Sequence, residues 1–450
     1  MTLLTKKPQK IGQNITNFRR FKMKNRFEQL MNSLSNNTVL SNWFEPMTQA
    51  LDKVRFSRGR FYRLEMDNFI LLGCLRQLQE ITTLREQVQS LFHLNEYSEQ
   101  VPLARSTWSD AISSKLRSKV LRQAMEKLVE STLTTLPDRY QAIAELNDRN
   151  IYALDCTYQT ESSHYQPIYP KEGGKDNQKG HLILTTYDLR KGVAIDVGAA
   201  TESIGEMRFV KEQWEASHLT TKKKAIYVVD RAFIDKAYWN ERKEKYQATV
   251  ITRMKSTLKH ELKQVLDTEN SKDNDGVYQD LKIQLKGSNT PWRLIRFSAP
   301  SGEDYEYLTN DFSLKPGTVA FLYHRRWDEE KYFDAYKNDL ASSKAWGKSL
   351  VSIEQQAMMG VISYLLTRLF LVKTSAELAL DEDKMIQEKK YKKKKASYRV
   401  NSKEIRYRAY YSETSKITRQ VWRFLKNCFI KKNRPALYER QLRPLLEGYI

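Results

Sequence analysis

The spacing of apolar residues divides the chain near residue 136. Before this point, apolar residues recur every three or four positions in Asn25–Leu34, Asp67–Ser90 and Ser106–Leu133, which predicts a series of helices. Short helices that are separated by turns and rich in arginine suit a helix-turn-helix-like DNA-binding domain, although helical bundles of any function share this pattern. We therefore predict a helical DNA-end-binding domain over residues 1–135.

After Pro137 the apolar residues form short runs bounded by turn residues. Three such runs, at Ile151–Asp155, His181–Tyr187 and Gly192–Gly198, predict neighbouring strands joined as a meander. A helix, a strand, a helix and a strand are predicted next, at Ser203–Trp214, Ala225–Asp230, Lys236–Tyr246 and Ala248–Arg253. This succession is the order of a ribonuclease H-like core, so the sequence predicts an α/β fold for its middle part.

A segment of different character follows this core. Residues 254–315 combine a polar, turn-rich stretch with strand-like runs, which predicts a β-rich insertion. Pro316-Gly317 then marks the start of a helix that continues through Lys337, with Thr318 as its possible cap. We therefore predict a ribonuclease H-like domain at 136–350 that contains this insertion.

The last hundred residues, 351–450, are predicted to form a helical, basic region. Their most apolar run, Ala357–Val372, spans about 16 residues and contains Arg368. A membrane span needs about 20 apolar residues, so a buried core helix is the better interpretation. The three cysteines are scattered without metal or disulfide spacing, which favours a reducing compartment and a cytoplasmic location without a membrane partner.

The net charge of +22 is concentrated at the two ends. Residues 1–60 carry +9 and residues 384–450 carry +15, which leaves −2 for the middle. A basic surface of this size indicates a polyanionic partner, and nucleic acid is the usual one.

Candidate chemistry lies in the nearly neutral middle. Asp155 and Asp230 each end a predicted strand, and the first and fourth strands of such a sheet are neighbours, so the two acids would meet. A strand-end aspartate on its own is more often a turn or cap residue than a metal ligand.

One helix offers a third acid in an unusual polar setting. With about 100° per residue, Tyr323, Arg326, Glu330 and Lys337 share one narrow face of the predicted helix. Asp334 falls close to that face, whereas Glu329 is predicted to point away. A carboxylate flanked by groups that bind phosphate indicates metal-dependent phosphoryl transfer.

These residues carry a resemblance to a known family. Asp155-Cys-Thr157, Asp230-Arg-Ala-Phe233 and Tyr323-x2-Arg326-x3-Glu330-x6-Lys337 resemble the insertion-sequence transposases of the DDE class, specifically the insertion-sequence-four type family with the Y-x2-R-x3-E-x6-K signature. The order of aspartate, aspartate, β-rich insertion and glutamate is also similar, and the resemblance covers about residues 100–350.

The resemblance implies a DNA transposase that cuts the ends of a mobile element and joins them to target DNA. It implies Asp155, Asp230 and Glu330 as catalytic ligands of two Mg²⁺ ions, with Mn²⁺ as a possible substitute. Tyr323, Arg326 and Lys337 would bind DNA near the scissile bond. The implied partners are double-stranded DNA, as terminal inverted repeats and target, and a second copy of the chain in the DNA complex.

Two other functions stay open at this point. A ribonuclease H-like nuclease would cut DNA without strand transfer. A non-catalytic DNA-binding descendant of a transposase would keep the fold alone, although the presence of all three acids disfavours it.

Overall fold

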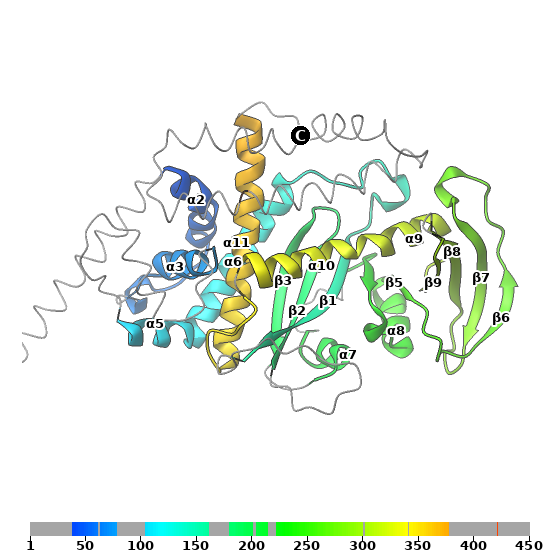
Figure 1. Cartoon of the computed structure of the whole chain (residues 1–450), viewed down its shortest axis with the longest axis horizontal. Coiled ribbons are helices and arrows are strands. Elements are labelled where there is room, and N and C mark those ends of the chain that lie inside the picture. The colour runs from blue at the N-terminus through cyan, green and yellow to red at the C-terminus, as the bar shows by residue number, and fades with distance from the viewer. Residues whose placement is uncertain are drawn as a thin grey trace, which may run out of the picture.

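A computed structural model describes residues 38–61, 64–78, 104–161, 180–200, 204–214, 222–299, 302–340, 342–377 and 421. The predicted helix at Asn25–Leu34 lies outside the described residues, as does most of the predicted basic C-terminal region. Figure 1 shows a broad sheet crossed by one pair of helices, with a group of helices packed at one end of it.

The first five strands form the predicted α/β core. β1 (Ile151–Thr160), β2 (Gly180–Asp188) and β3 (Val193–Ala200) are an antiparallel meander. β4 (Ile226–Val229) lies parallel to β1, and β5 (Thr249–Arg253) lies parallel to β4. The meander and the neighbouring first and fourth strands are therefore confirmed.

β1 is longer than predicted. The sequence indicated a strand that stops at Asp155, but β1 continues to Thr160 because β2 pairs with it along this whole length. The parallel partner β4 stops at Val229, opposite Leu154. Asp155 therefore lies in the middle of a strand, at the point where its neighbour on one side ends.

The predicted β-rich insertion extends the same sheet. β6 (His260–Val265), β7 (Val277–Leu285), β8 (Trp292–Ser298) and β9 (Asp304–Thr309) continue it in the order β5-β9-β8-β7-β6. β6 was not predicted as a strand. All of its side chains are exposed at the sheet edge, so its sequence lacks the apolar alternation by which strands are found.

A buried ion pair joins the insertion to the helix that follows it. Arg293 on β8 donates two hydrogen bonds to Asp280 on β7, at 2.9 Å and 2.6 Å. Its remaining Nη1 group donates to the carbonyl oxygen of Leu314 at 2.6 Å. Leu314 lies just before the next helix, so Arg293 fixes the point at which the chain leaves the insertion.

This next helix crosses the sheet and is not continuous. α9 (Pro316–Arg325) and α10 (Trp327–Asp334) are separated at Arg326, and a π-helical turn, Ala335–Asp339, follows. Figure 1 shows α9 against the insertion and α10 against the meander. Thr318 was predicted to cap this helix, but it lies inside α9, which already begins at Pro316.

Gly317 allows α9 to approach the insertion closely. A Cβ atom at Gly317 would lie 1.7 Å from the backbone oxygen of Asp273, in the 3₁₀ turn η7 (Lys272–Asn274). The amide of Gly317 donates to the side chain of Asn274 at 3.1 Å. Any larger residue would push α9 away from this turn.

The remaining helices surround one long apolar helix. The long helix is α11 (Leu350–Glu377). Around it lie α2 (Thr38–Asp52), the 3₁₀ turn η1 (Arg58–Phe61), α3 (Met66–Leu78), α5 (Arg105–Ile112) and α6 (Lys115–Thr135). α11 contacts α2, α3 and α6 on one side and β3 on the other. The predicted helix Ser106–Leu133 is two helices, since Ser114 caps α6 at its own start.

α11 contains the apolar run that the sequence assigned to a core helix. Leu350–Thr374 is long and apolar enough to cross a membrane, but 89% of its most apolar window is buried inside the protein. Packing between β3 and the other helices accounts for its composition, as predicted.

Candidate functional site

The site is built where the parallel pairing of β1 and β4 ends. Leu154 pairs with Val229, and each is followed directly by an aspartate, Asp155 and Asp230. Asp230 caps the 3₁₀ turn η6 (Arg231–Phe233) by accepting a hydrogen bond from the amide of Ala232 at 2.5 Å. The shared register brings the two predicted acids to neighbouring strands.

Arg326 connects this sheet position to α10. Its Nη1 group donates to Asp155 Oδ2 at 3.1 Å, and its Nη2 group donates to Glu330 Oε1 at 2.6 Å. One guanidinium therefore bridges the strand acid and the helix acid that the sequence singled out. The break at Arg326 between α9 and α10 places this side chain directly above β1.

The acids influence one another electrostatically. The pKa of Asp155 is raised to about 6: burial is the main cause and the carboxylates of Asp230 and Glu330 add to it, while Arg326 and the amide of Cys156 oppose the increase. The three carboxylates of Asp155, Asp230 and Glu330 repel one another, so a cation bound between them would be stabilised.

The other two residues of the signature also face this region. The guanidinium of Arg326 lies 5.8 Å from the centroid of the Tyr323 ring. Burial lowers the pKa of Lys337, and the nearby Asp155 raises it. Tyr323, Arg326, Glu330 and Lys337 thus converge as the sequence predicted, even though the helix changes its winding between them.

One prediction made from the helical wheel is wrong. Glu329 was expected to point away, but its side chain is fully buried and lies against Asp155. Burial raises its pKa well above the ordinary value. Asp334 was expected close to the face of Glu330, and its side chain is exposed. The wheel placed Glu329 relative to Tyr323 alone and could not include β1, against which α10 packs.

A fourth carboxylate near the site had no signal in the sequence. Glu206 is the first residue of α7 (Glu206–Phe209), which packs beside η6. The pKa of Glu206 is raised to about 7, chiefly by burial and also by the neighbouring carboxylates of Asp230 and Asp155. It lies far from the other acids along the chain, so only the tertiary structure reveals it.

The carboxylates offer the oxygen ligands that Mg²⁺ and Mn²⁺ prefer. Among the described residues, however, no three acidic, histidine or cysteine side chains are close enough to hold a metal ion. The guanidinium of Arg326 lies between Asp155 and Glu330 instead. The donor chemistry fits a divalent cation, and binding one would require Arg326 to release these carboxylates.

The fold and the site thus define a mixed α/β protein with acids gathered at one sheet position. Residues 147–366, just under half of the chain, match the family model described as "Transposase DDE domain". This region contains Asp155, Asp230 and Glu330, together with the helix that carries the signature.

A curated relative is similar over about half of the chain. The probable transposase for insertion sequence element IS5377 from Geobacillus stearothermophilus is 25% identical over 219 residues. The match covers 48% of this chain and 55% of the relative, so it spans about half of the length of each. Both comparisons support a transposase, and neither tests the role of an individual residue.

A solved structure is similar at a lower level. The cryo-EM structure of the piggyBac transposase synaptic complex with hairpin DNA has a TM-score of 0.38 and 12% identity, covering 96% of this chain and 85% of that chain. Similarity at this level carries no argument about this protein.

Proposed function

We propose that this chain is a DNA transposase with a ribonuclease H-like core and the Y-x2-R-x3-E-x6-K signature. It would cleave the ends of a mobile element and join them to target DNA. The observation that carries the proposal is the single guanidinium of Arg326, which bridges Asp155 on β1 and Glu330 on α10 beside Asp230.

Asp155, Asp230 and Glu330 are proposed as ligands of two Mg²⁺ ions, for which Mn²⁺ could substitute. When bound, such ions activate an attacking oxygen and stabilise the leaving oxygen across phosphorus. The chain contributes three carboxylates from two neighbouring strands and one helix, all held by backbone that the core fixes. Asp155 is kept in place by the amide of Cys156, which donates to its Oδ1 at 2.8 Å.

Tyr323, Arg326 and Lys337 are proposed to contact DNA beside the scissile phosphate. A guanidinium presents a planar pair of donors to phosphate, whereas the Lys337 ammonium acts as a point charge. Tyr323 and Arg326 are buried and Lys337 is half-buried, which limits their rotamer freedom before DNA arrives. Double-stranded DNA, as element ends and as target, and a homodimer in the DNA complex are the proposed partners.

The experiment that tests this function supplies the purified chain with duplexes carrying the element's own ends, Mg²⁺ and a target plasmid. We expect cleaved ends and joined products, and neither without the divalent ion. Cleavage without joined product would instead identify a ribonuclease H-like nuclease. DNA binding without cleavage under any divalent ion would identify a non-catalytic descendant.

Arg326→Gln is expected to raise the affinity of the metal-free protein for Mn²⁺ by about tenfold, because a cation that competes for two of the proposed ligands is removed. Titration calorimetry without DNA measures this affinity. Cleavage should fall in the same variant, since its phosphate contact is lost.

Lys331→Gln is the matched control for this measurement. Lys331 lies on the same helix, but its ammonium pairs with Asp328 at 3.4 Å and not with the proposed ligands. Its affinity for Mn²⁺ should equal that of the parent. A lower affinity in Arg326→Gln would mean that Arg326 organises the carboxylates and does not compete with the ion.

A further inference from the structure

A second polar site lies at the opposite end of the core strands. Here a pocket of about 460 Å³ is lined by Ala144, Glu145, Asp148, Arg149, Lys224, Lys243, Gln247, Asp311 and Ser313. Arg149, Lys224 and Gln247 come just before β1, β4 and β5, whereas Asp230 follows β4. The length of β4 separates the two sites by roughly 15 Å.

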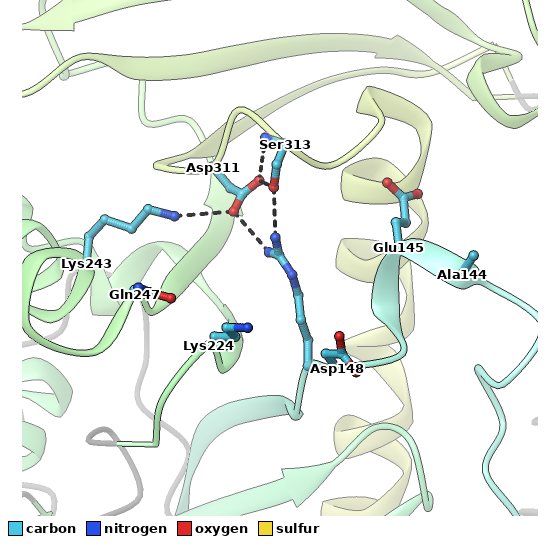
Figure 2. A pocket seen from close by; sticks show the side chains of 9 residues that line it. Ala144, Glu145, Asp148, Lys224, Lys243, Gln247, Asp311 and Ser313 are labelled. Carbon is cyan, nitrogen blue, oxygen red and sulfur yellow. Dashed lines mark hydrogen bonds and ion pairs between the residues drawn. The ribbon is translucent and has the colours of Figure 1, made fainter.

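A buried carboxylate holds two cations at this pocket. Asp311 is 3% exposed in its side chain, and its Oδ2 accepts from Arg149 at 3.0 Å and from Lys243 at 3.3 Å. Burial by itself would raise the pKa of Asp311, but Lys243, Arg149 and several hydrogen bonds lower it overall. Figure 2 shows Lys243 reaching toward Asp311 across the pocket.

This arrangement fixes the cations without neutralising both of them. One carboxylate carries one negative charge, so the pair of Arg149 and Lys243 keeps a net positive charge. An ammonium has three donors, and Lys243 uses one of them on Asp311. The remaining donors are available to a ligand in the pocket.

Two residues that line the pocket have a strained backbone. Lys224 and Gln247 have φ angles of 55° and 56°, and they are the only non-glycine residues with positive φ in the described part of the chain. Glycine occupies the other such positions, at Gly192, Gly276, Gly287 and Gly302. A left-handed conformation is unfavourable for residues with a Cβ atom. At Gln247 it ends the helix Lys236–Tyr246, where such a cap is common, whereas Lys224 has no helix to end and its strain is of the kind found at functional positions.

The lining holds three acidic and three basic side chains, but Glu145 and Asp148 lie away from Lys243 (Figure 2). Glu145 is directed to the start of α9, where it accepts hydrogen bonds from the amide of Lys315 and from Thr318. Figure 2 shows Glu145 on the side of the pocket opposite Lys224 and Lys243. Asp148 is exposed, and the exposed Lys222 and Lys223 precede Lys224 in the chain.

We infer that this pocket binds a phosphate of the nucleic-acid backbone, through Lys224, Lys243 and Arg149. The phosphate would belong to a stretch of DNA other than the one that is cut, because the pocket lies at the far end of β4. The inference rests on the proposed function for the identity of the polyanion as DNA. It explains why a lysine occupies a backbone conformation that glycine would adopt without strain.

Lys224→Gly separates binding from folding. Glycine relieves the left-handed strain, so the full-length variant should melt at a higher temperature than the parent. Loss of the ammonium should weaken binding to a duplex of about 40 base pairs by about threefold to tenfold at low salt. The slope of log affinity against log salt concentration should become shallower by about 0.9, the value for one phosphate contact.

Gln247→Gly is the matched control. It relieves the same strain at the end of α8 (Lys236–Tyr246) without changing charge, so it should raise the melting temperature and leave the salt slope unchanged. If both variants bind DNA with the parent's slope, the inference is wrong even where the parent cleaves DNA. If the parent itself does not bind the duplex, the proposed function fails as well.

A titration with inorganic phosphate and with a nucleoside triphosphate distinguishes the two sources of phosphate. Backbone binding predicts that neither stabilises the parent against heat at millimolar concentration. Stabilisation that disappears in Lys224→Gly, with an unchanged DNA salt slope, would overturn the inference in favour of a small phosphate ligand.

Discussion

Glu330→Gln is expected to reduce DNA cleavage by about 1,000-fold, because a neutral amide replaces one of three anionic ligands and metal ions contribute several kcal/mol to such reactions. Binding to element-end duplex should stay within about twofold of the parent, since most of the positive charge lies in the two ends of the chain. Single-turnover cleavage assays and fluorescence anisotropy measure the two quantities.

Two neighbouring acids are controls for this variant. Asp334→Asn removes an exposed carboxylate from the same helix and should leave cleavage unchanged. Glu329→Gln replaces a fully buried acid whose pKa burial raises well above its ordinary value, so a neutral amide should be tolerated much better there than at Glu330. Normal cleavage by Glu330→Gln, together with an inactive Glu329→Gln, would show that Glu329 and not Glu330 is the catalytic acid.

Arg293→Met should lower the free energy of unfolding by about 3–5 kcal/mol, the usual cost of leaving one partner of a buried ion pair alone. The side chains of Arg293 and Asp280 are 5% and 1% exposed, so water cannot replace the lost hydrogen bonds. Chemical denaturation of the full-length chain measures the loss. Cleavage should fall too, because Leu314 loses its anchor just before α9.

The double variant Asp280→Leu, Arg293→Met identifies the cause of this loss. Replacing both partners with apolar residues removes the isolated charge, so most of the stability should return. If the double variant is as unstable as Arg293→Met alone, the packing of the arginine side chain, and not the buried aspartate, accounts for the effect.

Local pattern was sufficient for most of the α/β core. Apolar runs bounded by turns located β1 to β5, and the predicted meander and the pairing of the first and fourth strands are confirmed. The apolar composition of Ala357–Val372 also indicated a buried helix, which α11 is. These features depend on residues close together in the chain, where periodicity reports burial directly.

Edge position and helix winding could not be predicted in this way. β6 has no buried face, so no alternation marks it. The helical wheel also misplaced Glu329, which the packing of α10 against β1 leaves fully buried. A helical wheel assumes uniform winding, which tertiary contacts override.

The sequence by itself determined which residues are candidates. They are two aspartates at neighbouring strands, and Glu330 with three residues at fixed intervals from it. Only the tertiary structure decided that Arg326 bridges Asp155 and Glu330, that Glu206 lies beside them, and that Arg149, Lys224 and Lys243 share a pocket. Residue types and their spacing are local properties, so the sequence alone can indicate which chemistry is a candidate. Distant segments come together only when the strands pair and the helices pack against the sheet.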